Sequence, residues 1–305
     1  MKNSFMEEMA CCKCCPRSCG INRLAGEKGF CRTGSDIPVA HIGLHHGEEP
    51  PISGTRGSGT IFLAGCNLRC VFCQNYQISQ EFEETGYRTL TPGELASEML
   101  RLEAGGAHNI NLVSPSHLIF PLADAIQLAR KRGLAIPIVY NSNGYDSVDA
   151  LRQIRGLIDI FMPDLKYLEN VTAGELSAAS DYPDIAKAAL REMLSQVGNL
   201  QLDGTGVAKK GLLVRHLVLP GYLENSRACL NFLAHFSRET HISIMSQYSP
   251  QYNASDYQRI NRTLSEREYN SLIDYALELN LENIFIQECN SSKEYLPDFQ
   301  REDPF

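Results

Sequence analysis

From residue 60 onward, short apolar runs alternate with longer amphipathic stretches, which is the pattern of strands joined by helices. The runs expected to form strands are 60–64, 109–113, 136–140, 158–162, 212–219, 242–245 and 283–287. The stretches expected to form helices are 91–103, 120–132, 147–155, 184–196, 226–236 and 265–279. Two helix starts are marked by local sequence, because Thr91 with Glu94 and Ser265 with Glu268 have capping-box spacing. Pro92 also suits the first position of a helix.

Repeated strand–helix units imply parallel strands joined by right-handed crossovers. Six or seven such units predict an α/β fold, a partial (β/α)6-type barrel, with its functional site at the carboxyl ends of the strands. A doubly wound sheet is the structural alternative. The predicted domains are a Cys-rich module over 1–35, a connector over 36–59, the barrel over 60–290 and a tail over 291–305. The connector is expected to be rich in loops because it contains Pro50, Pro51 and several glycines.

Composition narrows the class of protein. The 305 residues include 28 basic and 36 acidic side chains, a formal net charge of −8. This acidic balance argues against general binding of nucleic acids or membranes. No apolar stretch approaches the roughly 20 residues that span a bilayer, and residues 1–10 lack the order of a signal peptide. We therefore expect a cytoplasmic protein.

The eleven cysteines are clustered, and in a reducing compartment clustered cysteines indicate metal ligands. Cys66, Cys70 and Cys73 directly follow the first expected strand in a C-x3-C-x2-C run. Thiolates are the usual ligands of iron–sulfur clusters, so this loop would hold three corners of a [4Fe–4S] cluster and leave one iron open. The alternative is a zinc site completed by a distant His or an N-terminal Cys. The isolated Cys229 and Cys289 are expected to be packing residues.

A second group of cysteines lies in the N-terminal module. Its candidate ligands for a closed four-thiolate site are Cys12, Cys15, Cys19 and Cys31, with Cys11 and Cys14 as competitors. Structural zinc and a second [4Fe–4S] cluster are equally compatible with four thiolates.

C-x3-C-x2-C with an aromatic residue, here Phe72, before the third Cys resembles the signature of radical SAM enzymes. Four segments, Gly-Cys-Asn-Leu-Arg-Cys-Val-Phe-Cys-Gln-Asn-Tyr at 65–76, His-Asn-Ile-Asn-Leu-Val at 108–113, Ile-Pro-Ile-Val-Tyr-Asn at 136–141 and Arg-His-Leu-Val-Leu-Pro-Gly at 215–221, narrow the resemblance. Together they are similar to the branch described as pyruvate formate-lyase activating enzyme-related, the PflX type. The resemblance covers nearly the whole chain.

The resemblance implies a radical SAM barrel in which S-adenosylmethionine chelates the open iron. One electron, from a donor such as flavodoxin or ferredoxin, would cleave it to a 5′-deoxyadenosyl radical that abstracts hydrogen from a substrate. That substrate would be a glycyl-radical enzyme, as the label suggests, or another peptide or small metabolite. The rival class is a non-catalytic iron–sulfur electron carrier or metal-binding module; the missing fourth thiolate argues against a carrier.

Several polar residues follow the expected strands and are candidate contacts of the cofactor. Ser114 and Ser116 flank Pro115, which has no N–H, where relatives often carry a Gly-Gly-Glu-type segment that binds the methionine amino group. His117, in the same loop, is a candidate proton carrier or substrate contact. Phe72 would pack on adenine or fill the barrel mouth, and Asn75 would touch the nucleoside or cap the loop.

Two further loops resemble segments of glycyl-radical activating enzymes. Residues 141–144 (Asn-Ser-Asn-Gly) and 162–166 (Met-Pro-Asp-Leu-Lys) resemble their Thr-Asn-Gly and Asp-Leu-Lys segments, which contribute to cofactor binding and a monovalent cation site. The resemblance implies that Ser142, Met162 and Asp164 are candidate cation ligands, that Asn143 is near the cofactor, and that Lys166 pairs with the methionine carboxylate or simply with Asp164.

The later strands contribute the remaining candidates. Arg215 suits bidentate recognition of a carboxylate. Since strand faces alternate, only one of Arg215 and His216 is expected to face the site. Gln247 and Tyr248 would reach adenine or substrate.

Overall fold

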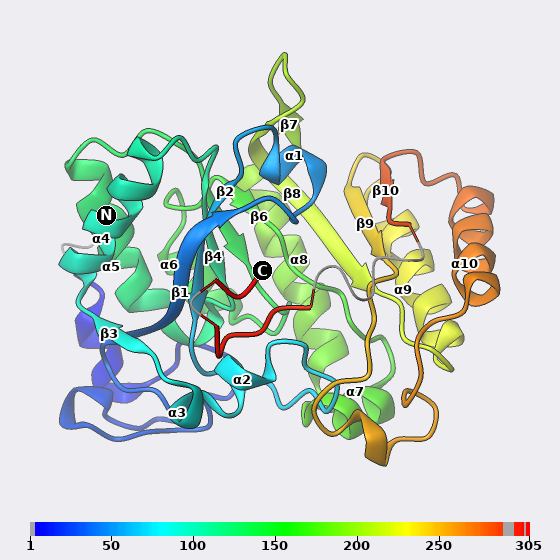
Figure 1. Ribbon diagram of the computed structural model, residues 1–305, viewed down its shortest axis with the longest axis horizontal. Coiled ribbons are helices and arrows are strands. Elements are labelled where there is room, and N and C mark those ends of the chain that lie inside the picture. The colour runs from blue at the N-terminus through cyan, green and yellow to red at the C-terminus, as the bar shows by residue number, and fades with distance from the viewer. Residues whose placement is uncertain (1–3, 289–295, 302) are drawn as a thin grey trace.

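A computed structural model describes residues 4–288, 296–301 and 303–305; Cys289 lies outside them. Its centre is a sheet in the order β10-β9-β8-β6-β5-β4-β2-β1-β3 (Figure 1). The neighbouring strands from β2 to β10 pair in parallel, and all seven expected strands are present: β2 (Ser58–Leu63), β4 (Ile110–Val113), β5 (Ile138–Asn141), β6 (Ile160–Phe161), β8 (Ala208–Leu217), β9 (His241–Met245) and β10 (Ile284–Ile286).

The order of the parallel strands separates the two predicted architectures. From β2 to β10 each strand lies beside its predecessor in the parallel series, so the chain always progresses in one direction across the sheet. A doubly wound sheet would reverse direction at a switch point. The fold is therefore an open, partial (β/α) barrel, as predicted, and its strands' carboxyl ends share one rim.

The expected helices are also present. They are α4 (Pro92–Ala104), α5 (Ile119–Lys131), α6 (Val148–Gln153), α8 (Tyr182–Val197), α9 (Leu223–Phe236) and α10 (Glu266–Glu278). Both predicted capping boxes form, at Thr91 with Glu94 and at Ser265 with Glu268. Smaller elements that the sequence analysis did not predict are α2 (Tyr76–Ser79), α3 (Phe82–Thr85), α7 (Asn170–Ser177) and β7 (Gln201–Leu202), which pairs with β8.

The prediction of a loop-rich connector over 36–59 is wrong. Residues 37–45 form β1 (Ile37–His45), which pairs antiparallel with β2 and with β3 (Arg88–Leu90) and extends the sheet. After it, α1 (Pro50–Ser53) lies at the top of Figure 1, where the Asn109 side chain, just before β4, donates to the Ile52 carbonyl at 2.7 Å. Pro38 and Gly43 obscured the strand pattern. Pro38 lies at the start of β1, next to an irregularity in register between Val39 and His41, and proline is tolerated in sheets at such positions.

The N-terminal module has little regular structure, with only η1 (Met6–Cys11) and η2 (Arg23–Ala25). It is docked on α5 by two contacts. The rings of Phe5 and Phe120 stack with centroids 6.0 Å apart. The carboxylate of Asp124 accepts hydrogen bonds from the Phe5 N–H at 2.9 Å and from the Ser4 hydroxyl at 3.0 Å.

Replacing Asp124 with alanine should therefore loosen the N-terminus. Hydrogen bonds to a charged group contribute about 1.5–3 kcal/mol, so we expect faster proteolytic cleavage within the first thirty or so residues while the barrel stays intact. Limited proteolysis followed by mass spectrometry measures this. Asp149→Ala, a change at an exposed carboxylate on α6, is the control; equal cleavage in both variants would contradict the docking role.

Among the described residues, no helix is both long enough and apolar enough to cross a bilayer.

Candidate functional site

The cysteine loop leaves the carboxyl end of β2 and is held by α7. The backbone N–H groups of Arg69 and Val71 donate to the carbonyls of Ser177 and Leu176 at 3.1 and 3.0 Å. Gly65, which opens the loop, has a φ of +80°, and a Cβ there would lie 2.8 Å from the carbonyl oxygen of Cys31. Glycine is required at this position.

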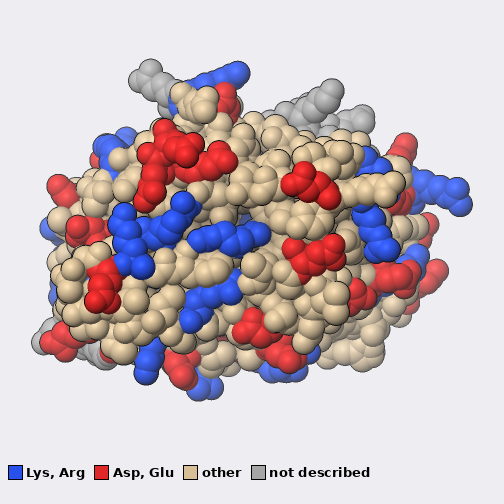
Figure 2. Space-filling view, turned by 90° about the horizontal axis from the view of Figure 1, so that it is seen from below, with Lys and Arg blue, Asp and Glu red and all other residues tan. Residues whose placement is uncertain are grey.

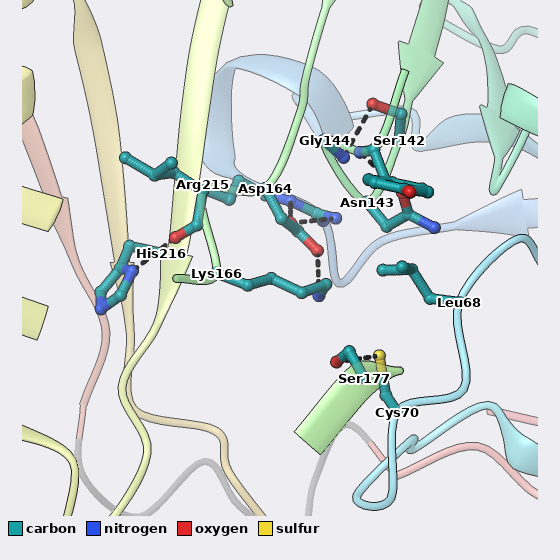
Figure 3. Close-up of polar contacts among 12 residues, drawn as sticks. Leu68, Cys70, Ser142, Asn143, Gly144, Asp164, Lys166, Ser177, Arg215 and His216 are labelled. Carbon is teal, nitrogen blue, oxygen red and sulfur yellow. Dashed lines mark hydrogen bonds and ion pairs between the residues drawn. The ribbon is translucent and has the colours of Figure 1, made fainter. Parts of the chain in front are cut away.

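Each of the three sulfurs has a polar neighbour. The Cys66 sulfur accepts from the Asn143 amide and from the Leu68 N–H, both at 3.4 Å. The Ser177 hydroxyl donates to the Cys70 sulfur at 3.0 Å (Figure 3). The Cys73 sulfur lies 3.2 Å from the Ser79 hydroxyl. Donors directed at sulfur stabilise thiolates, the form in which cysteine binds a metal.

The thiols themselves are poor acids in this setting. Burial raises the pKa of Cys66 to about 11 and that of Cys73 to about 12. Metal binding would therefore have to displace the protons. Among the described residues, no three His, Cys, Asp or Glu side chains are grouped as the ligands of one metal ion would be. Three buried sulfurs with nearby donors nevertheless fit an iron–sulfur cluster, which binds each thiolate at a separate iron.

The loop borders a cavity of about 630 Å³ inside the partial barrel. Five predicted site residues line it: Phe72, Cys73, Asn75, Asp164 and Arg215. Gln247 lines it as well, whereas Tyr248 is buried beneath Phe72, with ring centroids 5.9 Å apart. The volume is within the usual range for small-molecule sites.

A network of buried charges spans the cavity wall. Asp164 receives the Lys166 ammonium at 2.7 Å on one oxygen and the Arg215 guanidinium at 3.0 Å on the other (Figure 3). Arg215 also donates to the Asn141 side chain at 2.7 Å and lies 3.6 Å from Glu48. Burial would raise the pKa of Asp164, but Lys166 and Arg215 outweigh it and hold the pKa below its ordinary value. Asp164 is therefore ionised.

The ion pairs of Asp164 bear on the monovalent cation site that the sequence analysis predicted. Both oxygens of Asp164 are occupied by cationic side chains, and the Ser142 hydroxyl donates to Asp146 at 2.6 Å. Met162 is fully buried. The arrangement of these residues is that of an ion-pair network rather than of a ligand shell for a monovalent cation.

Asn143, predicted to lie near the cofactor, lies beside the cysteine loop. Its amide nitrogen bridges the Cys66 sulfur and the Asn67 side chain, and its oxygen accepts from the Tyr145 N–H at 2.9 Å. It therefore connects the β5 loop to the cysteine loop and contacts a candidate ligand directly.

The β4 loop is turned away from the cavity. Ser114 and Ser116 do not line it, and Ser114 has a φ of +59°. His117 is buried, with its Nε2 3.0 Å from the Ala64 carbonyl oxygen. Burial lowers the pKa of His117 to about 3, so it stays neutral. The structure gives His117 the role of supporting the end of β2 instead of the predicted role at the site.

Arg215 and His216 point in opposite directions, as strand alternation predicts (Figure 3). Arg215 lines the cavity, whereas the imidazole of His216 lies between the Leu165 carbonyl oxygen at 2.7 Å and the Ser226 hydroxyl at 2.9 Å, against α9.

The sequence analysis did not predict two acidic side chains that line the cavity. Glu48 and Glu49, between β1 and α1, line it together with His45 and His46. Asn111 donates to Glu48 at 2.9 Å, but one carboxylate oxygen of Glu49 is buried without a hydrogen-bond partner. Burial raises the pKa of both carboxyls, partly offset by Arg215. The acidic dipeptide was a visible signal, but its position at the cavity depended on the unpredicted β1.

Replacing Glu49 with glutamine should stabilise the protein at pH 8. The folded-state pKa of Glu49 is raised, so its ionised form opposes folding above the unfolded-state pKa, and this cost fades as the pH falls. We expect a gain of about 1–3 kcal/mol at pH 8 that shrinks at pH 5, measured by chemical denaturation. Glu224→Gln, at an exposed carboxylate on α9, is the control and should leave the stability nearly unchanged at both pH values; a pH-independent gain for Glu49→Gln would refute this reasoning.

Comparison with known proteins agrees with the site. The family model for the radical SAM superfamily matches residues 60–199, which include the cysteine loop, β2 to β6 and α7. Residues 60–199 form a radical SAM superfamily domain. This domain supplies the cysteine loop and the first part of the barrel.

Two relatives are uncharacterised proteins of Methanocaldococcus jannaschii. MJ0674 is 30% identical over 90% of this chain and 76% of its own length, and MJ0808 is 27% identical over 80% of this chain and 72% of its own. The match to MJ0674 covers 281 residues, so it extends far beyond residues 60–199, which the family model matches.

Three solved structures share the fold. Methylornithine synthase (PylB) and HydG, a maturase of the [FeFe]-hydrogenase, each align with a TM-score of 0.51, at 17% and 15% identity over 74% of this chain. Streptococcus suis SuiB bound to S-adenosylmethionine aligns with a TM-score of 0.50 at 12% identity over 78%. This chain spans 63%, 50% and 49% of those proteins, so the likeness concerns the barrel alone.

Proposed function

We propose that this protein reductively cleaves S-adenosylmethionine at a [4Fe–4S] cluster held by Cys66, Cys70 and Cys73. The cluster, when bound, would supply one electron to the sulfonium of S-adenosylmethionine, giving methionine and a 5′-deoxyadenosyl radical that would abstract a hydrogen atom from a substrate. The observation that carries the proposal is a loop of three cysteines, each with a polar group at its sulfur, at the rim of a cavity. Among the described residues that line the cavity, Cys73 is the one cysteine.

The chain's own residues would prepare the site. Asn143, Leu68 and Ser177 direct donors at sulfur and so favour the thiolates. Phe72 provides an apolar surface beside Cys73 and helps to exclude water. Arg215 presents a guanidinium to the cavity for a carboxylate of the cofactor or substrate. Lys166, paired with Asp164 beside Cys70, adds positive charge near the cluster thiolates.

The spectroscopic test is electron paramagnetic resonance of the reduced, anaerobically reconstituted protein. We expect a [4Fe–4S]⁺ signal whose shape changes when S-adenosylmethionine is added, because the ligand occupies the open iron. An iron–sulfur electron carrier, the rival function, would have a closed cluster, and its signal would be indifferent to S-adenosylmethionine.

We further propose that the chain belongs to the pyruvate formate-lyase activating enzyme-related branch and activates a glycyl-radical enzyme. The support is the four sequence segments at 65–76, 108–113, 136–141 and 215–221. Incubation with a glycyl-radical enzyme encoded beside this chain should give a glycyl-radical doublet. If the doublet is absent while S-adenosylmethionine is still cleaved, the result would favour a small metabolite or another peptide as the substrate.

The proposed electron donor is an acidic flavodoxin or ferredoxin. Arg17 and Arg69 both stack on Phe30, with guanidinium carbons 3.9 and 4.1 Å from the ring centroid, and Arg32 stacks on Phe82 at 5.0 Å. Arg69 is close enough to Arg17 and Arg32 for their charges to affect it. Figure 2 shows a band of lysine and arginine on the face that carries α2, α3 and α7 in Figure 1. Reduction by flavodoxin should slow as salt rises; a salt-independent rate would contradict this docking face.

A further inference from the structure

An arginine lies buried in the N-terminal module without a carboxylate partner. Arg23 is 2% exposed. Its guanidinium donates to the His117 carbonyl at 2.9 Å, to the Thr33 hydroxyl at 3.2 Å and to the Cys31 sulfur at 3.2 Å, while its Nε has no partner. No ion pair between the described residues involves it. A buried guanidinium is costly unless an opposite charge lies beside it.

Among the described residues, Cys31 is the acidic side chain that the Arg23 guanidinium contacts, at 3.2 Å from its sulfur. Cys12, Cys14 and Cys15 belong to the same module. All four are buried. Neutral thiols would leave Arg23 uncompensated, whereas four thiolates around a metal carry a net negative charge with both zinc and an iron–sulfur core.

The backbone brings the cysteines together. Residues 12–21 form a tight loop in which the Cys12 N–H donates to the Ile21 carbonyl at 2.9 Å and Ser18 N–H to the Cys15 carbonyl at 3.0 Å. Cys19, which is partly exposed, packs its sulfur against Gly29, where a Cβ would be 2.8 Å away. Cys14, which is fully buried, therefore stays a competitor of the partly exposed Cys19 for the fourth position.

We infer that Cys12, Cys15, Cys31 and a fourth sulfur, from Cys14 or Cys19, bind a second metal centre for which Arg23 is the buried counter-charge. Because no three His, Cys, Asp or Glu side chains of the described residues are grouped as the ligands of one metal ion would be, the shell suits a second [4Fe–4S] cluster, which binds each thiolate at a separate iron, rather than zinc. The Arg23 guanidinium donates a hydrogen bond to one ligand sulfur and balances the charge of the shell.

The centre abuts the candidate radical site. The carbonyl oxygen of Cys31 lies 2.8 Å from where a Cβ of Gly65 would be, one residue before Cys66. Arg23 donates to His117, whose imidazole contacts Ala64 at the end of β2. Through these contacts the second centre supports the start of the cysteine loop, next to Cys66. Its existence does not depend on the proposed radical chemistry.

The test uses a variant that lacks the three cysteines proposed to hold the first cluster. In the full chain carrying Cys66→Ala, Cys70→Ala and Cys73→Ala, anaerobic purification and metal analysis should still find about four irons per chain. Adding Cys12→Ser, Cys15→Ser or Cys31→Ser to this background should remove that metal, while the matched control Cys11→Ser, at an exposed cysteine of the same module, should retain it. A triple variant without stoichiometric metal, or one whose metal survives the three serine changes, would overturn the inference.

Two more variants test the details without relying on activity. Metal loss in one of Cys14→Ser and Cys19→Ser supports a four-sulfur shell, and retention in both refutes it. Arg23→Gln should release the metal to a chelator roughly 10–100-fold more readily, and Arg23→Lys should recover much of the loss. Equal retention in Arg23→Gln and the parent would rule out the counter-charge role. Circular dichroism checks that each variant remains folded.

Discussion

Replacing Cys66 with alanine is expected to abolish formation of 5′-deoxyadenosine from S-adenosylmethionine. Cys66 supplies one of the three candidate thiolates and receives the Asn143 and Leu68 hydrogen bonds. With two thiolates left, the cluster would lose a corner, and iron content should fall by about four per chain. Iron analysis and chromatography of the products measure both effects.

The control for this variant is Cys229→Ala, at a fully buried cysteine in α9. It leaves a small cavity and should cost some stability, but product formation should persist. If Cys66→Ala retained both iron and product, the assignment of the loop as the cluster site would be wrong.

Replacing Arg215 with methionine should cause the largest loss of stability among charge-removing changes. Arg215 pairs with Asp164 at 3.0 Å and lies 3.6 Å from Glu48, and both carboxylates are buried. Breaking a buried pair by removing one partner costs about 3–5 kcal/mol. Urea denaturation at pH 8 measures this loss.

The control pair is Arg262 with Glu268, which is more exposed, so Arg262→Met should cost at most about 1 kcal/mol. The pH dependence provides a second check. In the wild type the pKa of Asp164 is lowered, so its contribution is present above the unfolded-state pKa and lost as the pH falls through the folded-state value. In Arg215→Met the stranded carboxyls can protonate, so the deficit should narrow toward pH 5; a constant deficit would contradict this account.

Much of the barrel was predictable because its strands are short, apolar and separated by well-marked helices. Thr91 and Ser265 start helices through local hydrogen bonds that sequence spacing already specifies. The alternation of strand faces correctly separated Arg215 from His216. What periodicity could not decide was barrel against doubly wound sheet, since that depends on the order in which strands pair.

The unpredicted parts depend on long-range contacts. β1 is a strand because β2 and β3 flank it, although it contains Pro38 and Gly43. Glu49 lines the cavity only because β1 and α1 bring it there. His117 follows a strand, as catalytic residues often do, but the turn through Ser114 buries its ring against Ala64.

The contacts around the cysteine loop also join residues that are far apart in the sequence. Ser177 belongs to α7, about a hundred residues beyond Cys70, and no local pattern connects the two. Lys166 was correctly seen as a partner of Asp164 or of a carboxylate, and the structure contains the Asp164 pair. Arg17, Arg32 and Arg69 form no run in the sequence, and they become one basic group only through Phe30 and Phe82.

The most direct test of the central claim is S-adenosylmethionine cleavage by the full chain. The protein would be reconstituted anaerobically with iron and sulfide, reduced chemically, and supplied with S-adenosylmethionine, and 5′-deoxyadenosine and methionine would be quantified over time. The account predicts both products in equal amounts from the wild type and none from the variant lacking Cys66, Cys70 and Cys73. Product from the wild type no greater than from that variant would contradict it.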